Sequence, residues 1–404
     1  MQATQDYLLA LIILGVAAVS VGPTVAQKNY APGVTDTEIK IGQTMPYSGP
    51  VSAFGSIGRT QAAYFRKIND EGGINGRKIT LISLDDGYAP PKTIEQIRRL
   101  VEEDEVFALF QTLGTASNAA IQKYTNAKKV PNLFVGSVSE KIADPTNYPW
   151  TMPWNPPASL DGSVYGKWLL KERPNARTAV LYQNDDMGKD YTRGLKTALG
   201  AKAASMVIAE ASYETTDATV DSQLISLKAS GADTLFVAAT PKFAAQAIRK
   251  VYDLGWRPTF LITYPGSSVE TVLKPAGLEK SVGLISAYYG KSDSVTWKGD
   301  VGFENYLAFM KKYYPEANPE DGINSYGYAV ALTFVEVLKR CGDNLTRENL
   351  LRQAASLKDF VNPMLYPGIK LNTSATDYHP IKQMQMARFD GTRWTLFGDV
   401  IEAK

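Results

Sequence analysis

The stretch IKIGQTMPYSGP, residues 39–50, sets a pattern that repeats along the chain. Ile39–Met45 is apolar-rich and has the length of a strand, and Pro46–Pro50 consists of residues typical of turns. Apolar residues then recur at helical spacing until Gly72-Gly73 ends the run. A strand, a turn and a helix in this order form the first half of a βαβ unit.

The same alternation continues to residue 135. We expect strands over Ile79–Leu84, Val106–Phe110 and Val130–Val135, with helices around Ile94–Val101 and Ser117–Ala127. This order predicts an α/β fold, with a parallel sheet covered by helices on both faces.

The segment Asn147–Pro157 interrupts the rhythm with prolines and aromatic residues, and we place a connection between domains there. The alternation then resumes, which predicts a second α/β unit of similar plan. Its expected strands are Thr178–Tyr182, Met206–Ala211, Thr234–Ala239 and Thr259–Thr263. Helices over Phe303–Tyr313, Tyr326–Arg340 and Arg347–Leu357 and strands over Ile381–Phe389 and Trp394–Phe397 complete the prediction.

Composition excludes several classes of protein. The chain has 404 residues, enough for two domains, each with its own core. Its net charge of +2 gives no basic footprint for nucleic acid. The single cysteine, Cys341, and single histidine, His379, exclude an internal disulfide and argue against a zinc site or a Cys–His nucleophile pair. No phosphate-binding, dinucleotide-binding or nucleophile-elbow motif occurs, so we expect no metal, no cofactor and no catalytic residues.

Residues 1–26 are interpreted as a cleaved signal peptide. The apolar run Tyr7–Val21 is short for a membrane-spanning helix, and Thr24-Val25-Ala26 resembles a small-residue cleavage site. Asp6 and the lack of a basic residue before the run are unusual for a signal peptide. A retained N-terminal anchor is the alternative, and a wrongly assigned start codon would account for the missing charge.

Small and hydroxyl-bearing residues follow three of the predicted strands, in Pro46–Pro50, Thr112–Ser117 and Gly136–Ser139. In open α/β sheets, ligands bind outside the carboxyl ends of the strands. Backbone N–H groups and hydroxyls at a helix start favour an anion such as a carboxylate. Ordinary helix capping by Thr115 or Ser137 is the alternative for each loop taken alone. Asp85-Asp86 and Asp185-Asp186 are interpreted as strand-end turns and helix caps.

The start of the chain resembles a known family. Ile39-Lys40-Ile41-Gly42, Ser48-Gly49-Pro50, Phe54-Gly55, Asn69–Gly76 and Asp85-Asp86 occur in the order found in periplasmic solute-binding proteins of branched-chain amino acid ABC importers. The resemblance covers residues 36–400 and implies the type I periplasmic binding protein fold, in which two doubly wound parallel-sheet lobes are joined by three hinge crossings. Residues 36–152 with 288–362 would form lobe 1, and residues 153–287 with 363–404 lobe 2. The later crossings are expected near Ser286–Tyr289 and Val361–Pro367.

The resemblance also implies a function. A monomer in the periplasm would capture one small solute by hinge closure and deliver it to a membrane permease of an ABC transporter, with no covalent chemistry.

Site residues are implied only where positions match the family. In lobe 1 these are Tyr47, Phe54, Leu113, Gly114, Thr115, Gly136 and Ser137, and in lobe 2 they are Met187, Thr240, Tyr264 and Gly266. The chain departs from amino acid binders in two places. Met187 stands where an aromatic residue is common, and the loop after Thr259–Thr263 has no acid before Glu270 to pair with a ligand ammonium. We therefore rank a small hydrophobic carboxylate, such as an aromatic acid, ahead of a branched-chain amino acid.

Two other functions stay open. A ligand-sensing receptor ectodomain of the same fold is expected to continue into a membrane helix, which does not follow before Lys404. A secreted hydrolase would depend on His379 as its base, and this residue has no partner pattern around it.

Overall fold

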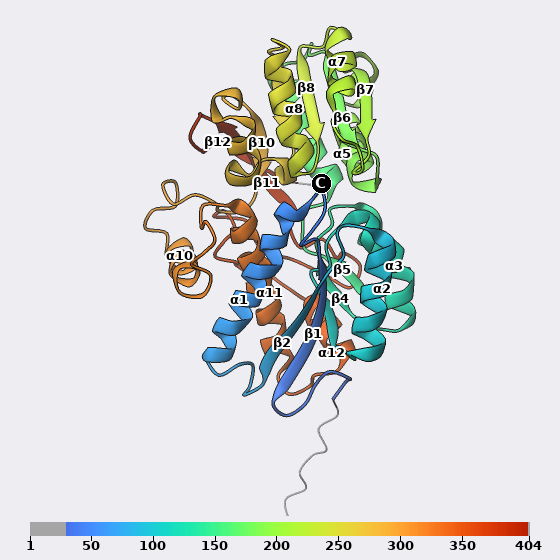
Figure 1. Ribbon diagram of the computed structural model, residues 1–404, viewed down its shortest axis with the longest axis vertical. Helices are drawn as coiled ribbons and strands as arrows, with labels where there is room; N and C mark the ends of the chain where they lie inside the picture. The colour runs from blue at the N-terminus through green and yellow to red at the C-terminus, as the bar shows by residue number, and fades with distance from the viewer. Residues whose placement is uncertain (1–29, 403–404) are drawn as a thin grey trace, which may run out of the picture.

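The computed structural model describes residues 30–402, which form two stacked lobes (Figure 1). Lobe 1 has a five-stranded parallel sheet in the order β2-β1-β3-β4-β5. Its strands are β1 Glu38–Met45, β2 Lys78–Asp85, β3 Ala108–Phe110, β4 Asn132–Val135 and β5 Thr151–Pro153. This sheet confirms the α/β class and the parallel order predicted for the first half of the chain.

The helices of lobe 1 come from two distant parts of the sequence. They are α1 Gly55–Asp70, α2 Pro90–Arg98, α3 Thr115–Ala127, α10 Val301–Tyr313, α11 Gly322–Cys341 and α12 Arg347–Ala354. An aromatic cluster joins α1 and α11 to the sheet: the ring centroid of Phe110 lies 5.5 Å from that of Phe65 and 4.5 Å from that of Phe334. Burial of these rings holds the late helices on the early sheet.

Lobe 2 has a seven-stranded sheet in the order β12-β11-β10-β9-β8-β6-β7. Its strands are β6 Thr178–Gln183, β7 Val207–Tyr213, β8 Thr234–Ala238, β9 Thr259–Ile262, β10 Ile285–Tyr288, β11 Gln383–Phe389 and β12 Trp394–Glu402. Strands β6 to β10 are parallel, whereas β11 pairs antiparallel with β10 and β12. The main helices are α4 Ala158–Glu172, α5 Asp186–Leu199, α7 Asp221–Ala229 and α8 Pro241–Asp253, with short α6 Ala203–Met206 and α9 Lys274–Ala276.

Three elements differ from the sequence prediction. The connection expected at 147–157 contains β5, which completes the lobe 1 sheet despite its proline. This proline ends a strand at the edge of the sheet, where a missing N–H is tolerated. Helix α4 was not expected, since its mixed polar and glycine-containing sequence shows no strong apolar period. Part of the expected second crossing is β10, a short strand that is buried along its whole length and therefore shows no alternation of apolar and polar faces.

The predicted lobe boundaries stay predictions. Contacts made by residues 365–378, however, help to locate the third crossing between the lobes. Gly290 pairs with Leu365, so the chain segments near the two later crossings run side by side. Beyond this bridge, Thr373 Oγ1 donates to the carbonyl of Ala354 (2.6 Å) and Tyr378 Oη to that of Pro149 (2.9 Å), both in lobe 1. We therefore propose that the chain crosses to lobe 2 at residues 379–382.

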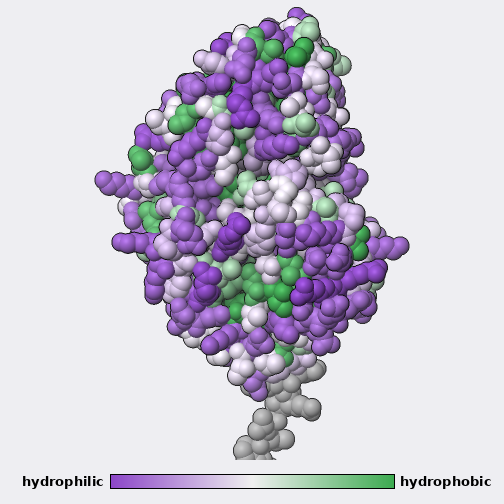
Figure 2. Space-filling model, in the orientation of Figure 1, coloured by the Kyte–Doolittle hydropathy of each residue, from purple (hydrophilic) through white to green (hydrophobic). Residues whose placement is uncertain are grey.

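Figure 2 shows hydrophilic residues over most of the visible face of both lobes, with an apolar area on lobe 1. Within residues 30–402, no helix has the length and apolar character needed to cross a bilayer. The predicted signal peptide, residues 1–26, lies outside the described residues.

Candidate functional site

A cavity of about 330 Å³ lies between the two lobes. It is lined from both sides, by residues that include Phe54, Tyr88, Thr115, Ser137 and Tyr326 of lobe 1 and Asp161, Met187, Tyr191, Thr240 and Tyr264 of lobe 2. The cavity lies at the carboxyl ends of the parallel strands in each lobe, where α/β sheets bind ligands.

The N-terminus of α3 forms the lobe 1 wall of the cavity. Gly114 precedes the helix with φ of 110°, and a Cβ at this position would lie 2.8 Å from the ring of Tyr88. Glycine is therefore needed both for the backbone conformation and for the close approach of Tyr88. Asn118 fixes the loop by donating to the carbonyls of Gly114 (2.8 Å) and Thr112 (3.0 Å).

The hydroxyls of Thr115 and Ser137 are held together at this wall, with their oxygens 2.9 Å apart. Both residues are buried in the closed cleft. Thr115 is the first residue of α3 and its hydroxyl does not cap the helix, so the capping alternative does not apply to it. The N–H groups of the first helical turn have no acceptors within the helix, and two hydroxyls lie beside them, an arrangement that suits a carboxylate.

The acid pairs singled out in the sequence are structural. Asp85 accepts hydrogen bonds from the backbone of Tyr47 (2.9 Å) and Gly87 (3.0 Å), and Asp86 accepts from Thr93 Oγ1 (2.8 Å). Asp185 caps α5 by accepting from the N–H of Gly188 (3.1 Å). These bonds confirm a strand-end turn at Asp85-Asp86 and a helix cap at Asp185, whereas α2 begins after Ala89 without a side-chain cap from the first pair.

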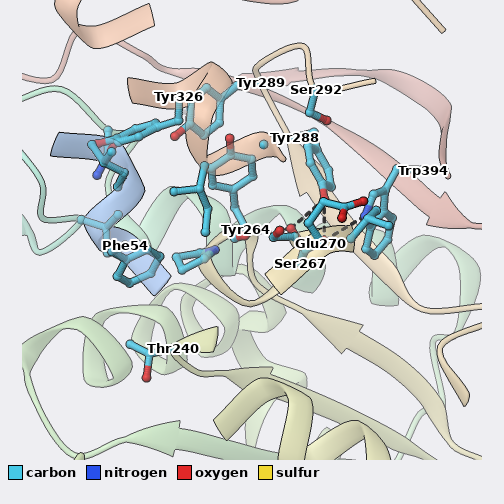
Figure 3. Close-up of a pocket in the computed structure, with 18 of the residues that line it drawn as sticks. Phe54, Thr240, Tyr264, Ser267, Glu270, Tyr288, Tyr289, Ser292, Tyr326 and Trp394 are labelled. Atoms are coloured by element: carbon cyan, nitrogen blue, oxygen red, sulfur yellow. Dashed lines mark hydrogen bonds between the residues drawn. The ribbon is translucent and has the colours of Figure 1, made fainter. Parts of the chain in front are cut away.

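Aromatic rings form much of the remaining wall (Figure 3). The ring centroid of Tyr264 lies 4.7 Å from that of Tyr289 and 5.2 Å from that of Tyr288. Tyr288 Oη donates to Ser267 Oγ (2.7 Å), and Trp394 Nε1 donates to the Ser267 carbonyl (2.9 Å), so the polar ends of these rings are satisfied within lobe 2. The wall that remains is largely apolar, which suits a hydrophobic ligand group.

Asp161, in the first turn of α4, is an acid in this cavity that the sequence analysis did not identify. Its side chain is 2 % exposed, and its Oδ1 atom has no hydrogen-bond partner. Burial raises the pKa of this carboxyl to about 7, an effect that the nearby Tyr191 hydroxyl and Tyr264 amide partly offset. The loop after β9 has no acid before Glu270, as stated from the sequence, but Asp161 brings a buried acid into the cavity from α4.

Glu270 also reaches the cavity, from the short helical turn that follows β9 (Figure 3). It forms an ion pair with Lys274 Nζ at 2.5 Å, so its charge is already compensated within lobe 2. Asp293, Glu320 and Arg393 line the same cavity.

The lobes touch each other directly on either side of the cavity. Ser139 Oγ and the N–H of Glu140 donate to the carboxylate of Asp190 (2.9 and 3.0 Å), and Lys141 Nζ lies 2.7 Å from Asp186 Oδ1. Ser268 Oγ of lobe 2 donates to Asp321 Oδ1 of lobe 1 (2.9 Å). These contacts describe a cleft in its closed form.

Comparison with known proteins places this geometry in a family. Residues 38–393 match the family described as periplasmic binding protein. The chain belongs to this family. Leu/Ile/Val-binding protein homolog 7 of Brucella suis biovar 1 is 25% identical over 343 residues, which cover 82% of each chain.

Solved structures share the fold of this periplasmic binding protein. A branched-chain amino acid ABC transporter protein from Thermus thermophilus, solved with bound valine, has a TM-score of 0.82 at 14% identity, covering 92% of this chain and 98% of its own. A solute-binding protein of an ABC transporter from Rhodopseudomonas palustris BisB5, solved with 3,4-dihydroxybenzoic acid, has a TM-score of 0.77 at 18% identity, covering 91% and 98%. At these identities the likeness concerns the fold.

The structure brings most of the predicted site residues of this periplasmic binding protein into one cavity. Its lining includes Phe54, Leu113, Gly114, Thr115, Gly136, Ser137, Met187, Thr240 and Tyr264. Tyr47 is not part of the lining; its hydroxyl bonds Ser83 Oγ (2.6 Å) behind the wall. Gly266 lies just outside, packed against α8, while its neighbours Pro265 and Ser267 line the cavity.

His379, on which a hydrolase would depend as its base, is not among the residues that line the cavity. Within residues 30–402, no group of three or more His, Cys, Asp or Glu side chains is arranged to hold a metal ion.

Proposed function

We propose that this periplasmic binding protein captures one small carboxylate between its lobes and delivers it, unchanged, to the membrane permease of an ABC transporter. The observation that carries the proposal is the cavity itself, which is lined by the N-terminus of α3 and the hydroxyls of Thr115 and Ser137 in one lobe and by aromatic residues in the other. A ligand that touches both walls at once favours the closed form over the open one.

The names of relatives support the transport role. A relative is named Leu/Ile/Val-binding protein homolog 7, and a solved structure of the same fold is named fatty acid ABC transporter substrate-binding protein. Lys141 pairs with Asp186, and Ser268 with Asp321, only when the two lobes meet. The closed lobes therefore present a combined surface that the open form lacks, and a permease can recognise that surface.

For the ligand we propose a small hydrophobic carboxylate, either an amino acid of the branched-chain type or an aromatic acid. The carboxylate would lie at the N-terminus of α3, and the apolar part would lie against Phe54, Tyr264 and Tyr289. Both classes occur among proteins of this fold, since one is solved with valine and another with 3,4-dihydroxybenzoic acid.

We further propose that residues 1–26 are a signal peptide that exports the chain to the periplasm, and that the mature protein acts as a monomer. Size-exclusion chromatography with light scattering, on protein secreted from its own leader, tests both statements. A dimer, or a leader retained on the exported protein, would contradict them.

Thermal denaturation with a panel of probes tests the function. L-leucine, L-valine, benzoate and 3,4-dihydroxybenzoate should include at least one compound that raises the melting temperature and binds with one-to-one stoichiometry in calorimetry. The Thr115→Ala/Ser137→Ala double variant should lose that shift. If no carboxylate stabilised the protein, or the double variant bound as tightly as the wild type, the proposal would fail.

A further inference from the structure

The single histidine of the chain lies at the hinge. His379 is the first residue of the proposed crossing at 379–382, and it follows Tyr378, whose hydroxyl donates to the carbonyl of Pro149 in lobe 1 (2.9 Å). The residue is half-buried, and its Nδ1 atom is shielded from solvent and has no hydrogen-bond partner within residues 30–402. A neutral imidazole can leave one nitrogen without a partner at modest cost, whereas an imidazolium would bury a charged N–H group that needs an acceptor.

The surroundings of His379 favour its neutral form while the lobes are closed. The imidazole faces the carboxylates of Asp377 and Glu140, the ammonium of Lys382, and the backbone of Asn155 between β5 and α4. Both carboxylates have other partners in this arrangement, since Asp377 forms an ion pair with Lys382 and Glu140 is engaged by lobe 2. Burial accordingly lowers the pKa of His379 below its usual value, although the two carboxylates oppose this effect.

Glu140 joins the lobes from the short helical turn Glu140–Ile142 of lobe 1. Its carboxylate accepts a hydrogen bond from Ser159 Oγ on α4 and forms an ion pair with Arg193 on α5, and both partners belong to lobe 2. Arg193 also pairs with Asp190 on its own helix, with 2.7 Å between Nη1 and Oδ1. When the lobes separate, Glu140 stays with lobe 1 and loses Ser159 and Arg193 together.

Opening of the cleft leaves His379 beside Glu140. Tyr378 is tied to lobe 1 through the carbonyl of Pro149, and Glu140 is itself part of lobe 1, so the imidazole keeps this carboxylate as a neighbour when lobe 2 moves away. A carboxylate that has lost its partners in lobe 2 can pair with an imidazolium and stabilise it. Glu140 therefore has one set of partners in the closed form and a different one in the open form.

We propose that Glu140 and His379 form an acid-sensitive switch at the hinge. In the closed form Glu140 binds Ser159 and Arg193 of lobe 2 and His379 is neutral, whereas in the open form Glu140 pairs with protonated His379. Opening thus takes up one proton from the solvent at the imidazole, so a fall in pH favours the open form and release of the solute. This inference goes beyond the proposed function and depends on it only for the effect on the solute.

Proton NMR spectroscopy of the untagged protein tests the pairing directly, because the chain has one imidazole to titrate. In the ligand-free protein, where no solute holds the lobes closed, Glu140→Gln should move the titration midpoint of His379 down by roughly half a pH unit, since it removes the carboxylate that pairs with the imidazolium. Glu336→Gln removes a carboxylate of similar exposure on α11 and should leave the midpoint unchanged. Equal midpoints in Glu140→Gln and the wild type would overturn the pairing.

Ligand binding tests the link to closure. The probe is the tightest binder among L-leucine, L-valine, benzoate and 3,4-dihydroxybenzoate. We expect its Kd, measured by calorimetry, to be about tenfold higher at pH 5 than at pH 7.5, and the titration midpoint of His379 to be lower in the saturated protein than in the empty one. His379→Gln should lose most of this change in Kd, because an amide takes up no proton in this range.

The outcomes separate the switch from the binding function. If the probe bound equally well at both pH values, or if His379→Gln kept the full pH dependence, the switch would be refuted while the binding function stood. If His379→Gln does not fold, the two wild-type midpoints decide, and equal midpoints with and without the probe refute the switch. If no probe bound, the proposed function would fail, and the titration of His379 in the wild type and in Glu140→Gln would still decide the pairing.

Discussion

The hydroxyl oxygens of Thr115 and Ser137 lie 2.9 Å apart across 22 positions of sequence. Thr115 follows β3 and Ser137 follows β4, and these strands are parallel neighbours in the lobe 1 sheet. Their carboxyl ends therefore meet at one edge, which turns two unremarkable loops into one hydroxyl-lined surface.

Removing these hydroxyls should weaken ligand binding without unfolding the protein. Thr115→Ala and Ser137→Ala are each expected to raise the Kd about tenfold, because one hydroxyl donates to the ligand carboxylate and the other positions that hydroxyl by donating to it. Calorimetry with the tightest probe measures the effect. The two losses should not add, since the hydroxyls bond each other. Ser222→Ala on α7 is the control, and equal affinities in all four proteins would contradict the assignment.

The ion pair between Lys141 and Asp186 should favour the closed form. The Lys141→Glu variant places two like charges across the cleft and is expected to weaken ligand binding about two- to fivefold at low salt. The pair is partly exposed, so added salt should reduce the effect. The double variant Lys141→Glu/Asp186→Lys should recover most of the affinity, and failure to recover would show that the pair has no part in closure.

Helices α4 and α5 pack so closely that side chains cannot be added at their contact. A Cβ at Gly194 would lie 2.1 Å from the carbonyl oxygen of Ser159, and one at Gly162 would lie 2.2 Å from that of Tyr191. Gly194→Ala should therefore destabilise the protein by about 2 kcal/mol or more through displacement of α4. Chemical denaturation measures this loss. Gly200→Ala offers a contrast, since that site has open space but a φ of 57°, and it should cost less.

The buried carboxyl of Asp161 should make the ligand-free protein less stable as the pH rises. An aspartate in the unfolded chain ionises near the reference value of 3.8, whereas Asp161 in the folded chain ionises at about 7. Between these values unfolding releases a proton, so a rise in pH favours the unfolded state.

Asp161→Asn should remove this dependence. We expect the variant to match the wild type near pH 4 and to exceed it by about 2 to 4 kcal/mol at pH 8, as measured by urea denaturation without ligand. A wild type whose stability rose in parallel with the variant over this range would show that Asp161 is ionised and compensated in the empty cleft.

The sequence was sufficient for much of the fold. Regular alternation of short apolar segments and amphipathic stretches located most of the strands and helices, because each element must bury one face against a neighbour. It failed at β5, α4 and β10. Their local patterns are weak or uniform, and the rest of the sheet and the adjoining helix decide their structure.

The hydroxyl loops around Thr115 and Ser137 were recognisable from their residues and from their place after predicted strands. Asp161 was not, since neither strand β5 nor helix α4, which follow one another just before and around it, was predicted from the sequence. Its position in the cleft depends on how the two lobes are joined and on the close packing of α4 against α5. The chain alone thus determined that an anion could be held at strand ends in lobe 1. Only the tertiary structure decided which acid faces that site, because burial and the missing partner of Asp161 arise from packing between distant segments.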